Sequence, residues 1–241
     1  MDIAGQTVVL IGGASGIGFA TAQAALAAGA RTVITSVEAG QLAAALGRLG
    51  GGATGQVLDV TREDDVAAFL AEVGQLDHLV TTAGDPLTRT HVLEQPTDAA
   101  RRSFEIRFWG QYFAAKHAAP RLRPGGSITF TTGLAGQRAT PGIVVLGAVC
   151  GAVEVLARGL AVELALVRVN VVCPGVVETG LWNAIPDETR RAFYARTAAE
   201  LPIGRVVRPE DLAEACLYFM RNGYSTGTVV VSDGGEAVVA P

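Results

Sequence analysis

Lysine is almost absent from this sequence: of its 19 basic residues, only Lys116 is a lysine. Charged residues make up 17% of the chain, and acids outnumber bases, which gives a formal net charge of −4. This balance argues against a nucleic-acid partner, which would require a basic surface. Few charges together with 49% hydrophobic residues indicate a globular protein with a large interior.

Cysteine is also scarce, since the chain has only Cys150, Cys173 and Cys216. An odd number without close spacing excludes a disulfide framework and a zinc site, so we expect reduced core thiols, no metal and a cytoplasmic protein. No apolar run approaches the roughly 20 residues of a membrane helix, and the N-terminus lacks the features of a signal peptide. We therefore expect no membrane partner.

The stretch 7–36 is the most informative part of the chain. An apolar run enters a turn that contains Gly12, Gly16 and Gly18, an alanine-rich helical segment follows, and a second apolar run closes the unit. A turn of this kind before a helix N-terminus offers free N–H groups and a favourable dipole to a dinucleotide pyrophosphate. The alternative is an ordinary tight turn beside a well-packed helix.

Apolar strand-like runs alternate with helical segments along the rest of the chain, which predicts one α/β domain over 1–241. A doubly wound parallel sheet between two helical layers, a Rossmann fold, explains this alternation. Further strands are expected near 57–58 and at 76–82, 126–132, 167–172 and 228–232, with helices at 63–73, 99–122 and 144–166. The more polar segment 178–201 is typical of a lid over a site at the carboxyl ends of the strands.

Several motifs follow one another in a familiar order: IGGASGIG, Asp59-Val60, TTAG, NVVCPG followed by VVET, LPIGRVVRPEDL and TGTVVVSDGG. Together they resemble the classical short-chain dehydrogenase/reductase family over nearly the whole chain. The resemblance implies a nicotinamide dinucleotide cofactor. The residues that it places on this cofactor are Gly12, Ser15, Gly16, Ile17, Gly18, Ser36, Asp59, Val60, Ala83, Gly84, Pro174, Gly175, Val177 and Thr179.

The family's proton chemistry depends on an Asn, a Ser and a Tyr-x-x-x-Lys pair. In this sequence the four matching positions hold Arg107, Gly133, Leu146 and Cys150. We therefore interpret the chain as lacking the catalytic pair and leave its catalytic residues unknown. Two candidates remain. Asp85 is a candidate acid, and the alternative is a loop-capping aspartate. Thr132 is a candidate hydroxyl, and the alternative is a strand-end threonine.

The resemblance also predicts which residues shape a substrate pocket. They are Asp85, Leu134, Gln137, Arg138, Leu181, Trp182 and Asn183. Arg107 is expected either to hold an acidic substrate or the cofactor, or to form an ion pair with Glu105 or Glu154. Cys150 is expected to be a packed core thiol rather than a nucleophile, because no cation is visible near it in the sequence.

The cofactor preference depends on the end of the second strand, where NAD-preferring members carry an acid. Here that residue is Ser36, which favours NADP(H) over NAD(H), although the nearby Glu38 would favour NAD. A cofactor site without a proton donor predicts hydride transfer to an activated small molecule such as an imine or iminium. The alternatives are a non-redox cyclase or isomerase, a redox sensor, or an inactive partner subunit.

The segments 99–122 and 144–166 resemble the helices that pair subunits in this family. Small residues on the second segment, among them Gly147 and Ala157, fit close helix packing. We expect a homotetramer, with a homodimer as the alternative.

Overall fold

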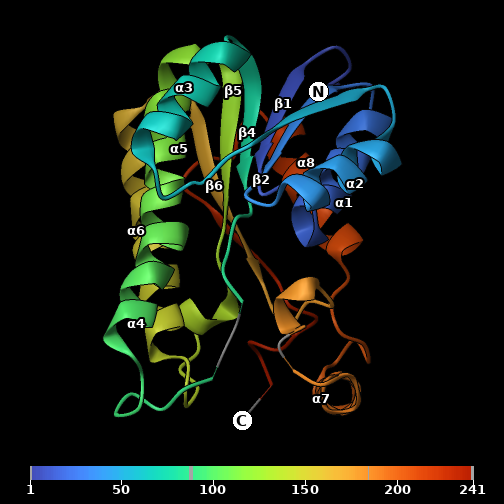
Figure 1. The fold of residues 1–241 in the computed structure, drawn as a ribbon, viewed down its shortest axis with the longest axis vertical. Coiled ribbons are helices and arrows are strands. Elements are labelled where there is room, and N and C mark those ends of the chain that lie inside the picture. Colours follow the sequence, from blue (N-terminus) through green and yellow to red (C-terminus); the bar gives the residue numbers. More distant parts are fainter. Residues whose placement is uncertain (1, 87–88, 184, 240–241) are drawn as a thin grey trace.

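Seven parallel strands form the centre of the structure (Figure 1). The structure is a computed structural model that describes residues 2–86, 89–183 and 185–239. The strand order is β3-β2-β1-β4-β5-β6-β7. The strands are β1 (Thr7–Ile11), β2 (Arg31–Ser36), β3 (Ala53–Val57), β4 (Leu76–Thr81), β5 (Leu122–Thr131), β6 (Arg168–Pro174) and β7 (Val229–Ser232). The doubly wound α/β fold expected from the sequence is confirmed.

Helices cover both faces of the sheet, as an apolar parallel sheet requires. One layer contains α1 (Gly16–Ala27), α2 (Ala39–Leu49) and α8 (Pro209–Arg221), and the other contains α3 (Glu63–Val73), α5 (Gly110–Ala118) and α6 (Val144–Glu163). Successive residues of β1 serve the two layers in turn: Leu10 packs in the first core cluster, and Val9 and Ile11 pack in the second. The buried apolar residues of β1 therefore alternate between two cores.

The region predicted as a helix over 99–122 consists of several pieces. It contains α4 (Thr97–Phe104), a π-helical turn η1 (Glu105–Trp109), α5, and a 3-10 turn η2 (Ala119–Arg121) that includes Pro120. A π-helical turn inserts an extra residue into the helix and frequently lies at a functional site. Here it carries Arg107.

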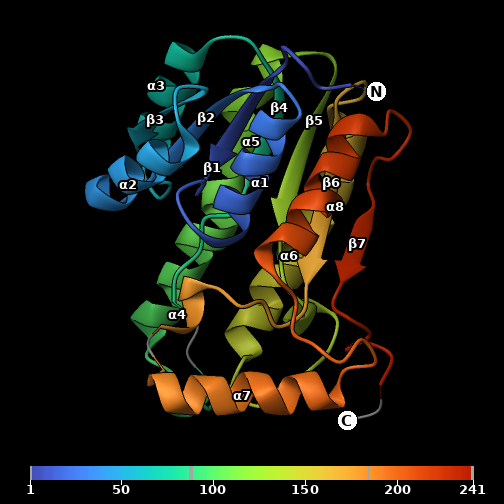
Figure 2. The same cartoon turned by 90° about the vertical axis from the view of Figure 1, so that its right-hand side faces the viewer.

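The segment 178–201 lies at the carboxyl ends of the strands, as Figure 2 shows for α7 (Asp187–Glu200). It begins with a 3-10 turn, η4 (Gly180–Trp182), and residue 184 within it is outside the described residues. The position is the one that a lid over this edge of the sheet would occupy.

Contrary to the expectation that no apolar run approaches this length, helix α6 is long and apolar enough to cross a membrane by length and composition alone. It packs against β6, and Ala157 of its small-residue set is buried in the core. Gly147 allows close packing inside the protein, because a Cβ at this position would lie 2.7 Å from the main-chain oxygen of Ala135. The outward face of α6 instead carries Val155 and Val162, which are strongly exposed.

Candidate active site

The glycine turn after β1 is packed too tightly for any other residue. A Cβ at Gly18 would lie 2.3 Å from the main-chain oxygen of Gly12, and one at Gly12 would lie 2.6 Å from the main-chain nitrogen of Ala83. The Thr82 hydroxyl closes the contact by donating to the Gly12 oxygen over 2.9 Å. The turn and the TTAG motif of the neighbouring strand therefore form one unit.

The start of α1 leaves hydrogen-bonding groups for a ligand. Ser15 occupies the N-cap but makes no side-chain hydrogen bond to the helix in the described structure. Gly16 adopts φ +50° and approaches Thr179, whose buried hydroxyl has no partner among the residues described. Free N–H groups and an orphaned hydroxyl around a glycine cradle fit the pyrophosphate of a dinucleotide.

Three other predicted cofactor residues, Ser36, Asp59 and Val60, lie at or just after the ends of β2 and β3. Burial alone would raise the pKa of the Asp59 carboxyl, but hydrogen bonds from the Thr61 main chain and hydroxyl hold it below its usual value. Val60 is buried and packs against Gly110. The Ser36 hydroxyl donates to Gln41 over 2.9 Å rather than pointing freely outward.

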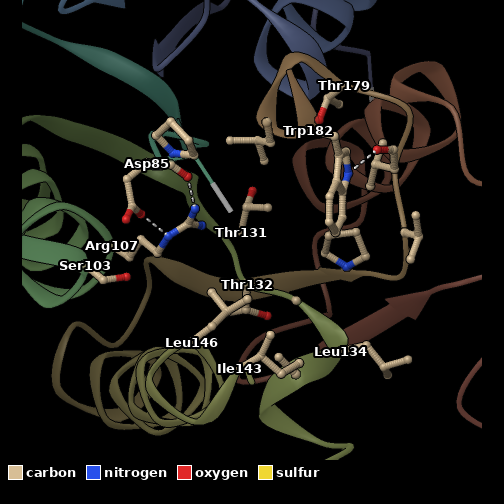
Figure 3. A pocket seen from close by; sticks show the side chains of 18 of the residues that line it. Asp85, Ser103, Arg107, Thr131, Thr132, Leu134, Ile143, Leu146, Thr179 and Trp182 are labelled. Carbon is tan, nitrogen blue, oxygen red and sulfur yellow. Dashed lines mark hydrogen bonds and ion pairs between the residues drawn. The ribbon is translucent and has the colours of Figure 1, made fainter. Parts of the chain in front are cut away.

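A cleft opens at the carboxyl edge of the sheet and runs past the end of β6 (Figure 3). Of the predicted cofactor residues, those that line it are Ile17, Ala83, Gly84, Pro174, Gly175, Val177 and Thr179. Ser15 and Gly16 line a second groove that shares Thr179 with the cleft. The indole N–H of Trp182 donates to the Val177 carbonyl over 2.9 Å, so η4 is fixed over the cleft.

Arg107 reaches into the cleft from η1 and pairs with Asp85 (Figure 3). Its Nε donates to Asp85 Oδ1 and its Nη2 to the Asp85 main-chain oxygen, each over 2.5 Å. The expectation that an ion pair would involve Glu105 or Glu154 is wrong, because the π-turn directs the side chain toward the loop after β4. The pair also engages Asp85 with a permanent cation, which disfavours Asp85 as a free acid.

The other three positions that the resemblance matches to the catalytic set hold Gly133, Leu146 and Cys150. Gly133 and Leu146 line the cleft, and Cys150 is buried behind them on α6. Burial raises the pKa of the Cys150 thiol to about 11, although Arg107 acts in the opposite direction. The thiol is therefore protonated at neutral pH, which agrees with a packed core residue rather than a nucleophile.

The Tyr-x-x-x-Lys spacing does occur once in the chain, at Tyr112 and Lys116. The interpretation that the chain lacks any Tyr-x-x-x-Lys pair is therefore wrong. Both residues lie on α5, where the exposed Lys116 ammonium binds Glu63 over 2.7 Å, and neither lines the cleft. The spacing is therefore present at a site away from the candidate active site.

Two threonines at the end of β5 line the cleft. The Thr132 hydroxyl, a candidate from the sequence, is buried without a hydrogen-bond partner in the described chain and lies near the buried Cys173 thiol. Thr131, one residue earlier, has a hydroxyl without a partner in the described chain, and Figure 3 shows it inside the pocket. Thr131 is therefore a second candidate hydroxyl beside Thr132, and the sequence did not indicate it.

Most of the predicted substrate-pocket residues lie together around the cleft. Those that line it are Asp85, Leu134, Arg138, Leu181 and Trp182. Two predicted members lie elsewhere: the Gln137 amide donates to the buried Glu154, and Asn183 lines the second groove. Each of these two residues is next in sequence to a residue that lines the cleft, but the local turn directs its own side chain away from the cleft.

Glu236, in the chain after β7, is a cleft residue that sequence reasoning missed. Burial raises the pKa of its carboxyl, and Oε2 accepts a hydrogen bond from the Val176 main-chain nitrogen over 3.3 Å. Asp233 fixes this part of the chain by accepting from the main-chain nitrogens of Gly235 and Ala237. Within the described ranges, no group of three or more His, Cys, Asp or Glu residues is placed to hold a metal ion.

Comparison with known proteins gives consistent matches. The family profile described as enoyl-(acyl carrier protein) reductase matches residues 12–236. The short-chain dehydrogenase/reductase ATR9 of Stachybotrys chlorohalonatus is 34% identical, with 97% of each chain covered.

Two solved structures are similar along almost the whole chain. One is a small-chain dehydrogenase in complex with NADPH, with 32% identity, a TM-score of 0.83, and coverage of 98% of this chain and 100% of that one. The other is the MalC reductase/Diels-Alderase of Malbranchea aurantiaca, with 31% identity, a TM-score of 0.90 and 96% of each chain covered. The glycine turn, the cleft and these matches together show that the chain is an oxidoreductase-type member of the short-chain dehydrogenase/reductase family.

Proposed function

We propose that this protein is an NADP(H)-dependent oxidoreductase whose acceptor is an activated C=N group, an imine or iminium. One observation carries the proposal: the residues suited to a dinucleotide surround a cleft in which Gly133 and Leu146 take the places of hydroxyl groups. The cofactor, when bound, supplies a hydride. The chain's own residues then bind, orient and shield the reactants.

Each part of the cleft has a definite task in this account. The glycine turn and the first N–H groups of α1 hold the pyrophosphate, and the orphaned Thr179 hydroxyl donates to it. Trp182, fixed on the Val177 carbonyl, covers the cleft and excludes water from it. Arg107 and Asp85 neutralise one another beside Gly84 and shape the wall of the pocket.

The acceptor class follows from the missing acid. Reduction of a neutral ketone creates an alkoxide, and general acid catalysis of that step contributes about 10²–10⁴-fold, or roughly 3–5 kcal/mol. An iminium already carries the positive charge that a ketone gains only from a proton donor. A cleft in which Gly133 and Leu146 stand at the donor positions therefore favours C=N over neutral C=O acceptors.

The preference for NADP(H) rests on the surroundings of Ser36. Position 36 carries no carboxylate that would repel the 2′-phosphate of the cofactor. The Ser36 hydroxyl itself donates a hydrogen bond to Gln41. Beside it, the second groove is lined by Ser15, Gln41 and Arg48. Arg48 lies 4.0 Å above the Phe19 ring centre and supplies a positive charge to the groove.

Initial rates test the proposal. We expect NADPH oxidation with 2-methyl-1-pyrroline to exceed that with cyclohexanone by at least a hundredfold, which is the lower limit of the acid-catalysis term. Equal rates with the ketone would contradict the choice of acceptor. Failure of NADPH to saturate the protein in a calorimetric titration would contradict the cofactor site itself.

A second candidate function is cyclisation without net redox change. The similarity to a protein described as both reductase and Diels-Alderase favours it, because a shaped apolar pocket with a resident nucleotide would serve either purpose. The oxidation state of bound cofactor separates the two: it changes on addition of an imine in the first case and stays constant during turnover in the second.

The assembly we propose is a homotetramer or homodimer built on α5 and α6. Exposed apolar side chains at Trp109, Val155 and Val162 occupy this side of the molecule, which supports an interface between copies. We also propose a cytoplasmic location, supported by the three unpaired and buried cysteines.

A further inference from the structure

Three charged side chains around the cleft form no salt bridge with one another in the described chain. Arg107 has Asp85 as its partner, but Arg89 and Arg138, which also line the cleft, make no ion pair with any described residue. Glu236 lies beside them and likewise makes no salt bridge within the described chain. Unpaired charges of both signs in a partly desolvated cleft suggest a ligand that carries both.

Arg138 and Glu236 touch without using their opposite charges. Arg138 Nη1 donates to the main-chain oxygen of Glu236 over 2.6 Å. The Glu236 carboxylate turns instead to the Val176 nitrogen and lies over Gly175, where a Cβ would be 2.7 Å from Oε2. The contact fixes the arginine while leaving its other N–H groups and the second carboxylate oxygen available to the cleft.

Arg89 is brought to the same wall by a main-chain contact. The Thr90 nitrogen donates to the Gly142 oxygen over 2.9 Å, and a Cβ at Gly142 would lie 3.3 Å from Arg89 Cβ. Both arginines are near enough to Glu236 to lower the pKa that burial raises. The three charges therefore belong to one small region, with two cations beside one carboxyl.

We propose that this wall recognises a cyclic imino acid, whose carboxylate binds Arg138 and Arg89 and whose cationic nitrogen faces Glu236. The inference rests on the proposed function, because a C=N acceptor supplies the cationic nitrogen. Guanidinium groups bind carboxylates through charge-assisted and often bidentate hydrogen bonds. A carboxylate beside the nitrogen would also hold the C=N group in one orientation within the cleft.

Calorimetric titration of the protein saturated with NADP⁺ tests this recognition without any turnover. Pipecolate carries both charges, whereas piperidine and cyclohexanecarboxylate have the same ring size and only one charge each. We expect pipecolate to bind at least tenfold more tightly than either of them. Equal affinities of the three compounds, or no binding of pipecolate, would overturn the inference.

Matched variants assign the two halves of the ligand. Arg138→Gln should weaken pipecolate and cyclohexanecarboxylate at least tenfold and leave piperidine unchanged, while Glu236→Gln should weaken pipecolate and piperidine only. Arg196→Gln, an exposed arginine on α7 outside the cleft, is the control and should change nothing. Equal effects of Arg138→Gln and Arg196→Gln would overturn the inference.

The two proposals fail in different ways. Tight pipecolate binding without reduction of any imine would contradict the oxidoreductase proposal alone. Rapid reduction of 2-methyl-1-pyrroline with no preference for pipecolate would contradict the imino-acid inference alone.

Discussion

At the scale of single residues, an ion pair between Arg107 and Asp85 forms part of the cleft wall. Arg107 places a permanent cation where the resemblance expects an amide, and Asp85 compensates it through two hydrogen bonds. Both side chains are mostly buried, with 14% and 24% of their surface exposed. The pair therefore matters to stability, because neither charge is free to return to water.

Asp85→Asn tests the importance of this pair. The variant leaves the Arg107 guanidinium without an anion, so we expect a loss of about 1–3 kcal/mol in the free energy of unfolding, measured with urea. Asp98→Asn is the matched control, because its pair with Arg101 is solvent-exposed and 3.8 Å long. We expect that control to change stability by less than about 0.5 kcal/mol. Similar losses in both variants would show that the cleft pair has no special role.

Ser36→Asp tests the cofactor preference. An aspartate at the end of β2 would repel the 2′-phosphate and accept from a free ribose hydroxyl. We expect NADPH affinity to fall at least tenfold, about 1.4 kcal/mol, and NADH affinity to rise. Ser36→Ala is the control, since it removes the bond to Gln41 without adding charge. A preference for NADH in the unaltered protein would contradict the assignment.

At the scale of elements, the strands that form the cleft are held in register by buried polar contacts. The Gln111 side chain of α5 accepts from the Thr81 hydroxyl and donates to the carbonyls of Arg107 and Thr131. His78 of β4 lies between Ser127 and Gln6, at 2.8 Å and 2.7 Å. These contacts connect Gln6, just before β1, with β4, β5 and the π-turn, so the positions of the cleft residues depend on them.

His78 gives the fold a predictable pH dependence. Burial, with help from Arg168, lowers its pKa from 6.5 to about 4. The unfolded chain therefore binds a proton before the folded protein does, so stability falls as the pH decreases from 6.5 toward 4, by an amount on the order of 3 kcal/mol.

Urea unfolding between pH 7 and pH 4.5 measures this effect against His78→Asn. The variant removes the titrating group, so the difference in stability between the two proteins should shrink as the pH falls. A difference that is constant over this range would show that His78 does not titrate differently in the two states.

The sequence predicted the buried elements better than the exposed ones. β1, β4 and β6 are apolar runs packed on both faces, so their approximate positions follow from composition alone. β3 is an edge strand with the sequence ATGQV, mostly exposed, so apolar runs indicate only its last residue. Helix α2 buries only Leu42 and Ala45, and it was not predicted for the same reason.

The residues of the cleft likewise divide into those that the sequence predicted and those that it did not. Motifs located the glycine turn, Thr179 and Arg138, because those residues follow recognisable patterns. The partner of Arg107 was not predictable, because the π-turn that redirects it has no sequence signal of its own. Glu236 was missed because its place in the cleft depends on how the chain folds back after β7, held by Asp233.

At the scale of the whole molecule, the candidate active site lies at one edge of the sheet, and one side of the molecule is apolar. α7 crosses the carboxyl ends of the strands (Figure 2), while Trp109 of η1 and Val155 and Val162 of α6 are exposed. Val155 and Val162 are seven residues apart and therefore share one face of α6. A second copy of the chain would bury this face.

Val162→Arg tests the proposed assembly. Val162 is 79% exposed in the single chain, so a charge there should leave the fold intact but disrupt a paired helix face. We expect the unaltered protein to elute as a tetramer or dimer in size-exclusion chromatography with light scattering, and the variant to shift to smaller species. Tyr224→Arg, 99% exposed in the loop before β7, is the control. A monomeric unaltered protein would contradict the proposal.

The central claim is that this cleft transfers hydride to C=N, and that the positions matched to the family's proton donors supply no acid for a neutral ketone. Mass spectrometry of products formed with NADPH deuterated at nicotinamide C4 tests it most directly, with 2-methyl-1-pyrroline and cyclohexanone offered together. We predict that deuterium appears in the amine and that labelled alcohol forms at least a hundredfold more slowly. Labelled alcohol at a comparable rate, or an amine without deuterium, would contradict the account.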